Sequence, residues 1–131
     1  MKGTPEVNKK IADQWVADLR SGDFLQGTGA LRGPNPETGQ PGYCCLGVLA
    51  YRAIERGGLP SVLMEAKILH TEVCRWAGMT QDGDPHVPVH VQLVGVDAPM
   101  ISDFRKLSTM NDAGTSFKVI ANLIEQNWES L

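Results

Sequence analysis

The sequence predicts one α+β domain in which about four helices pack around a small antiparallel sheet of two to three short strands. Apolar residues recur every three to four positions in several segments, as they do on the buried face of a helix. Residues 86–94 instead alternate between apolar and polar side chains, which is the pattern of a half-buried strand. A length of 131 residues is typical of one domain, so we expect a single globular domain spanning 1–131.

Four segments carry the helical pattern. They are residues 4–22, 43–58, 59–78 and 115–131. Thr4 and Pro5 suit the start of the first helix, and the pair Gly57 and Gly58 suits the end of the second. We expect the apolar faces of these helices to meet in one core. Its predicted members are Trp15, Leu46, Val48, Leu49, Trp76, Phe117, Ile120 and Ile124.

Two segments are expected to be strands. The first is a short strand around residues 24–31, followed by a long loop to Gly42 that is rich in Gly and Pro. The second covers residues 86–94, where Pro88 indicates an edge strand. Its buried face is expected to carry Val87, Val89, Val91 and Leu93. Its other face is expected to carry His86, His90 and Gln92.

The composition argues against several classes of protein. The net charge is -3 and the 12 Lys and Arg residues are scattered, so we expect no basic surface for a nucleic-acid polymer. The N-terminal residues lack the apolar core of a signal peptide, and no apolar run is long enough to span a bilayer. We therefore expect the protein to stay in the compartment in which it is synthesised and not to associate with a membrane. The 3 cysteines include the neighbours Cys44 and Cys45, which predicts reduced thiols.

Cys45 has two interpretations. It follows the turn at Gly42 and opens a helix, where unpaired main-chain amides stabilise a thiolate. The run Cys-Leu-Gly-Val from Cys45 resembles the Cys-Ser-Gly-Leu start of bacterial cell-wall endopeptidases of the papain superfamily. That resemblance implies Cys45 as nucleophile, Gln40 as oxyanion donor, and His86 or His90 as base. The other interpretation, which we favour, is that Cys44 and Cys45 are small buried hydrophobes.

The spacing of histidines and cysteines predicts no metal site. His86 and His90 would lie roughly 13 Å apart on a strand, which is too far to share one ion. His70 and Cys74 would share a helix face, but they supply only two of the four ligands that structural zinc needs. We therefore expect no metal and no cofactor.

The densest polar cluster lies at residues 111–117, directly before the last helix. A helix N-terminus has free main-chain amides and a positive dipole end, which favour an anion. We expect any ligand site here, with a small polar or anionic ligand. Its predicted contacts are Asn111, Asp112, Thr115 and Ser116, with Arg20 or Arg32 as the charge partner. The alternative is that Asp112, Thr115 or Ser116 simply caps the helix.

Two segments are the most specific motifs of the chain. One is Tyr-Cys-Cys-Leu-Gly-Val-Leu at residues 43–49, and the other is Asn-Asp-x-Gly-x-Ser-Phe-x-x-Ile-Ala at residues 111–121. Weaker matches of the same resemblance lie at residues 15–22, 26–32, 76–78 and 107–110. Together they resemble a family of small proteins encoded by tailed bacteriophages. The resemblance spans nearly the whole chain, and it carries no catalytic or binding residue with it.

The resemblance implies a biological context for the protein. It implies a phage accessory protein that acts in the cytoplasm of the bacterial host cell. Proteins of this kind bind a host component, so the first hypothesis is a non-enzymatic binding module. It would serve in counter-defence by sequestering a small nucleotide-type signal or by blocking a host protein. The second hypothesis is the papain-like thiol hydrolase with Cys45 as nucleophile. The sequence leaves the formation of a homo-oligomer open.

Overall fold

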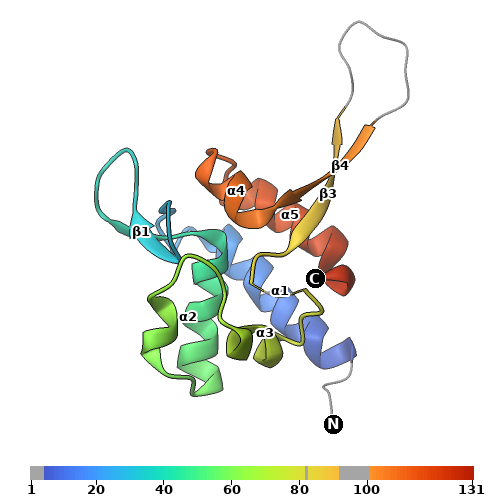
Figure 1. The fold of residues 1–131 in the computed structure, drawn as a ribbon, viewed down its shortest axis with the longest axis horizontal. Coiled ribbons are helices and arrows are strands. Elements are labelled where there is room, and N and C mark those ends of the chain that lie inside the picture. Colours follow the sequence, from blue (N-terminus) through green and yellow to red (C-terminus); the bar gives the residue numbers. More distant parts are fainter. Residues whose placement is uncertain (1–4, 82, 92–100) are drawn as a thin grey trace, which may run out of the picture.

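The computed structural model describes residues 5–81, 83–91 and 101–131, in which helices alternate with two strand hairpins (Figure 1). The helices are α1 (Pro5–Ser21), α2 (Cys45–Gly57), α3 (Thr71–Ala77), α4 (Leu107–Asp112) and α5 (Phe117–Asn127), with 3-10 turns η1 (Ser61–Met64) and η2 (Trp128–Ser130). The strands are β1 (Arg32–Pro34), β2 (Pro41–Tyr43), β3 (His86–Val91) and β4 (Ile101–Lys106). The predicted single-domain α+β class is confirmed. No helix in the described part of the chain is both long and apolar enough to cross a bilayer.

Helix α2 forms the centre of the core. Its residues Leu46, Val48 and Leu49 are at most 1% exposed, and α1, α3 and α4 all pack against it. Helix α1 also packs along α5 (Figure 1). Every residue of the predicted core belongs to this one cluster, with Trp76 partly buried at its margin. The helical periodicity of the sequence therefore identified the buried faces of α1, α2 and α5 correctly.

The strands form two separate antiparallel hairpins in the residues that the structure describes. β1 pairs with β2, and β3 pairs with β4. The β3–β4 hairpin leads away from the helices in Figure 1. Val87 is buried and His86 is exposed, as the alternating pattern predicts. The predictions for Val89, His90, Val91, Gln92 and Leu93 concern side chains that lie outside the described part.

The prediction of a strand at residues 24–31 is wrong. Regular pairing begins only with β1, and the earlier segment contributes a single bridge between Gln26 and Tyr43. The amide of Tyr43 donates to the Leu25 carbonyl at 2.8 Å, and the amide of Gly27 donates to the Tyr43 carbonyl at 2.8 Å. The Gly- and Pro-rich stretch that we expected to be a loop instead contains β1 and β2. Their pairing provides hydrogen-bond partners for main-chain amides and carbonyls that burial removes from water.

The prediction of one continuous helix over residues 59–78 is also wrong. The η1 turn comes first, and α3 begins only at Thr71. The amide of Leu31 donates to the Ala66 carbonyl at 2.9 Å, so the main chain between the two elements bonds to a distant segment rather than to its own helix. Val62, an apolar residue near the start of that expected helix, is 60% exposed. The apolar spacing fitted a helix, but long-range main-chain pairing decided the conformation.

Candidate functional site

Asn111 lies at the centre of the predicted polar cluster, and it is fully buried. Its Oδ1 accepts from the amide of Cys45 at 3.1 Å and from Gln26 Nε2 at 2.9 Å. Its Nδ2 donates to the Gly27 carbonyl at 2.8 Å and to Asp112 Oδ1 at 3.3 Å. An asparagine amide has two donors and two acceptor positions, so the protein itself uses all of them. Asn111 therefore ties the loop around Gly27 to the first turn of α2.

The other residues of this cluster also bond within the chain. Asp112 Oδ1 accepts from the amide of Gly29 at 3.1 Å, and the Thr115 carbonyl accepts from Gln26 Nε2 at 2.8 Å. The hydroxyl of Ser116 accepts from the amide of Val119 at 3.4 Å and caps α5, which is one of the two roles that the sequence left open. The structure thus brings the four residues together, but Ser116 caps a helix, Asn111 and Asp112 anchor loops, and Thr115 contributes its main-chain carbonyl.

Neither predicted charge partner is directed to the polar cluster. Arg20 on α1 bonds to Glu125 on α5 at 3.0 Å and to Asn122 at 2.7 Å. The guanidinium of Arg32 lies over the ring of Tyr43, 5.8 Å from its centroid. Both arginines therefore have contacts of their own. The cluster at the start of α5 is better explained as a set of contacts that hold the loop around Gly27 to α2 and cap α5 than as an anion site.

Cys45 is fully buried at the start of α2, and its Sγ lies 3.6 Å from the Leu107 carbonyl. Burial raises the pKa of the Cys45 thiol well above its ordinary value and raises that of Cys44 to about 11. A nucleophilic cysteine needs the opposite shift. The interpretation of both residues as buried hydrophobes is confirmed, and the third cysteine, Cys74, is buried as well.

The predicted partners of Cys45 do not form a catalytic site with it in the described residues. Gln40 is exposed in the β1–β2 hairpin, and His86 is exposed on β3 with its Nδ1 3.3 Å from Gln81 Oε1. The side chain of His90 lies outside the described part. A thiol enclosed in the core cannot meet a substrate at these surface positions. The geometry therefore gives no support to the thiol hydrolase.

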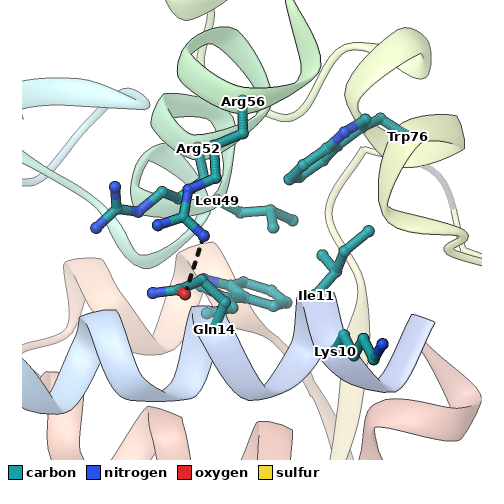
Figure 2. A pocket seen from close by; sticks show the side chains of 8 residues that line it. Lys10, Ile11, Gln14, Leu49, Arg52, Arg56 and Trp76 are labelled. Carbon is teal, nitrogen blue, oxygen red and sulfur yellow. Dashed lines mark hydrogen bonds between the residues drawn. The ribbon is translucent and has the colours of Figure 1, made fainter. Parts of the chain in front are cut away.

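A groove between α1, α2 and α3 is the strongest candidate for a ligand site (Figure 2). Its volume is about 270 Å³. Apolar side chains line one part of it, namely Ile11, Trp15, Leu49 and Trp76. Polar and cationic side chains line the rest, namely Lys10, Gln14, Arg52 and Arg56. The groove therefore offers an apolar surface and positive charge to the same ligand.

The two indole rings of the groove are held by contacts with α2. Trp15 Nε1 donates to the Cys45 carbonyl at 2.8 Å, which fixes the orientation of its ring. Trp76 packs against the last residue of α2, Gly57, where a Cβ atom would lie 2.7 Å from Trp76 Nε1. Only a residue without a side chain leaves room for the indole there. The sequence predicted that Gly57 and Gly58 end the helix, and Gly58 does so at φ 68°; the contact with Trp76 is an additional role for Gly57.

The two arginines of the groove differ in how far their charge is neutralised. Arg52 binds the buried Asp18 through Nε at 2.8 Å and Nη2 at 3.0 Å, and it binds Glu55 through Nη1 at 2.6 Å. Arg56 donates to the neutral amide oxygen of Gln14 at 3.1 Å, and its Nε lies 3.6 Å from Glu55. Its side chain is 56% exposed, against 20% for Arg52. Arg56 is therefore the arginine of the groove that has more charge to offer a ligand.

A smaller pocket continues the apolar part of the groove. It has a volume of about 30 Å³ and shares Ile11, Trp15 and Leu49 with the groove. Its other walls come from the end of α3 and from the C-terminal residues Trp128 and Leu131. This space is apolar and about the size of one water molecule. It extends the apolar surface without adding a second polar site.

The sequence contained a partial signal for this groove. Lys10 and Gln14 are four residues apart on α1, and Arg52 and Arg56 are four residues apart on α2, so each pair shares one helix face. Each pair borders the apolar stripe of its helix. Such a pair is usually a solvated edge, and periodicity does not say which helices meet. The sequence therefore gave no reason to combine the two pairs with Trp76.

Comparison with known proteins places the chain in one family. The family model described as "Domain of unknown function (DUF8296)" matches residues 7–128. Neither the curated proteins nor the solved structures include a match to the chain. The matched range includes every residue that lines the groove.

Proposed function

We propose that this chain, which belongs to the DUF8296 family of domains of unknown function, is a binding protein that holds a small anionic ligand in the groove between α1, α2 and α3. The observation that carries the proposal is the pairing of an apolar surface with a cationic rim in one groove. Trp15, Trp76 and Leu49 form the apolar part, and Arg56 and Lys10 carry the charge. Binding sites for small molecules commonly combine such surfaces.

The charge on the rim supports an anion as the ligand. Arg52 already bonds to the carboxylates of Asp18 and Glu55, and neither carboxylate lines the groove. Lys10 adds a further positive charge. A guanidinium donates to phosphate or carboxylate in a planar, two-bond geometry that is stronger than a neutral hydrogen bond. A ligand anion would therefore replace the neutral Gln14 amide as the partner of Arg56.

The side chains that line the groove favour binding over catalysis. The lining consists of Lys, Arg and Gln side chains together with aliphatic residues and two tryptophans. No Cys, His, Asp or Glu belongs to that lining among the described residues. Nucleophilic and acid–base catalysis most often use such groups, and the one lysine of the lining, Lys10, is solvent-exposed. The same set of residues is well suited to hold a ligand unchanged.

The resemblance to small bacteriophage proteins supplies the proposed setting. In that setting the protein acts in the host cytoplasm as an accessory protein. Sequestering a small nucleotide-type signal would be a counter-defence function of a binding protein without an enzymatic step. The groove is consistent with such a ligand because nucleotides combine an apolar ring with an anionic group.

Isothermal titration with a panel of small anions tests the proposal. The panel contains inorganic phosphate, ribose 5-phosphate, AMP and GMP. Arg56→Gln should weaken binding of the best ligand roughly tenfold or more, because it removes a charged donor from the rim. Arg32→Gln is the matched control, since Arg32 is the charge partner predicted from the sequence and lies over Tyr43 instead. Failure of every anion to bind, or loss of binding in Arg32→Gln alone, would contradict the proposal.

A further inference from the structure

Building on the function proposed above, we infer that the groove selects a ligand with one planar aromatic ring and one anionic group, with the ring against Trp76 and the anion on Arg56. The chemistry is that of an aryl or heteroaryl phosphate or carboxylate. Three observations carry it: the fixed position of Trp76, the unequal neutralisation of the two arginines, and the small volume of the groove.

Contact with α2 fixes the position of the Trp76 indole, and a face of this ring borders the groove. One edge of its indole, formed by Nε1, Cδ1 and Cε2, contacts Gly57, so this edge faces α2. In Figure 2 Trp76 and Ile11 border the groove from α3 and α1, and Leu49 reaches toward the same space from α2. A flat ring fits such a slot because it can stack on indole on one side and contact aliphatic carbon on the other. A sugar or a compact ion gains little from either wall.

Arg56 is the group on which the anion should bind. Arg52 already binds two carboxylates, and its bonds to Asp18 use two of its donor groups. The short bond of Arg56 is to a neutral amide, the Gln14 oxygen. Exchange of that amide for an anion turns a neutral acceptor into a charged one, which strengthens the hydrogen bond. The same exchange at Arg52 would require separation from Asp18, whose side chain is only 5% exposed.

The volume limits the ligand to one ring system. The groove measures about 270 Å³, whereas pockets for drug-sized ligands span roughly 300–1,000 Å³. The adjoining space of about 30 Å³ cannot take a second ring. A mononucleotide or a simple aryl acid therefore matches the groove in size, and a dinucleotide would leave one base outside it.

Binding of AMP, GMP and phenyl phosphate is compared with that of ribose 5-phosphate by isothermal titration and by tryptophan fluorescence. The aromatic ligands should bind roughly tenfold more tightly than ribose 5-phosphate, and only they should quench the tryptophan emission of the protein, with Trp76→Leu losing that quench. Tighter binding of AMP or GMP than of phenyl phosphate identifies a nucleotide as the source, and equal binding identifies a simple aryl phosphate. Either result supports the inference.

Two variants test the role of the indole. Trp76→Leu removes the ring, and Gly57→Ala displaces it from behind without changing any residue that lines the groove. In both variants the ratio of AMP affinity to ribose 5-phosphate affinity should fall toward one. Thermal unfolding confirms that each variant is folded. If neither variant folds, the comparison of ligand affinities on the unaltered protein still decides whether the groove selects an aromatic ring.

The outcomes separate this inference from the function on which it rests. If ribose 5-phosphate binds as tightly as AMP, and Arg56→Gln still weakens both, the aromatic selection is wrong and the anion-binding function stands. If AMP binds tightly and both indole variants keep that preference, the ring stacks elsewhere and the inference is again wrong. If none of the four ligands binds, the inference and the proposed function fail together.

Discussion

Replacement of Asn111 by Ala should destabilise the fold rather than only remove a ligand contact. The asparagine accepts from the amide of Cys45 and donates to the Gly27 carbonyl, and both groups belong to buried residues. Alanine would leave these two main-chain groups without a partner. Gln26 Nε2 would keep its second acceptor, the Thr115 carbonyl. The variant therefore tests whether this residue holds the loop at Gly27 to α2.

The expected loss follows from counting the groups left unpaired. A buried polar group without a partner costs about 1–3 kcal/mol, so two of them cost about 2–6 kcal/mol. A domain of ordinary stability unfolds with about 5–15 kcal/mol, so this loss is a large share of the total. We expect Asn111→Ala to lower the free energy of unfolding by about 2–6 kcal/mol and to leave little folded protein if the starting stability is low.

Urea unfolding followed by circular dichroism measures this loss, with the free energy obtained by linear extrapolation. Asp112→Ala is the matched control, because Asp112 is exposed and its carboxylate accepts from the exposed amide of Gly29. The control should lose less than about 1 kcal/mol. A loss below about 1 kcal/mol for Asn111→Ala, with an unchanged urea dependence, would refute the structural role and return Asn111 to the list of ligand contacts.

The thiols should resist labelling in the folded protein, because burial raises the pKa of Cys44 to about 11 and that of Cys45 well above its ordinary value; DTNB at about pH 8 should react only after unfolding, and fast native labelling of Cys45 would revive the thiol hydrolase. Gly47→Ala should lower the free energy of unfolding by about 2 kcal/mol or more in urea, because its Cβ would overlap the Leu31 carbonyl oxygen, and an unchanged stability would mean that α2 can move. Arg20 lowers the pKa of Glu125 below its ordinary 4.5, so the pair stabilises the fold above that value and loses its effect as the pH falls through the lowered pKa. Glu125→Gln should therefore remove a small part of the loss of stability on acidification between about pH 5 and pH 3. An unchanged pH dependence of the free energy of unfolding in this range would contradict the linkage.

The polar cluster shows why the sequence could locate a feature and still not assign its role. Residues 111–116 were expected to cap the last helix or to hold an anion. In the structure Ser116 is the cap, and the buried Asn111 bonds to both α2 and the loop around Gly27. Both uses need short polar side chains beside a helix terminus. What separates them is burial, and the burial of Asn111 arises because the loop around Gly27 folds over it. That loop lies 84 residues away in the chain.

The sequence by itself determined the elements whose signals are local. The apolar repeat and the terminal residues define α1, α2 and α5, the alternating pattern defines β3, and the buried faces of the helices follow from the same repeats. These signals depend on residues a few positions apart, so they survive without knowledge of the fold. The expected burial of Cys44 and Cys45 followed instead from how often free cysteines are buried, and the structure buries both.

Only the tertiary structure decided the shape of 24–43, the interruption of the expected helix at 59–78, and the location of the candidate groove. In the first two cases, hydrogen bonds between distant main-chain segments outweighed local preference. The groove exists because α1, α2 and α3 meet and bring Lys10, Arg56 and Trp76 to one surface. The sequence around each of these residues does not mark it as part of a binding site. Their joint chemistry depends on the relative placement of helices, which periodicity along one chain segment does not contain.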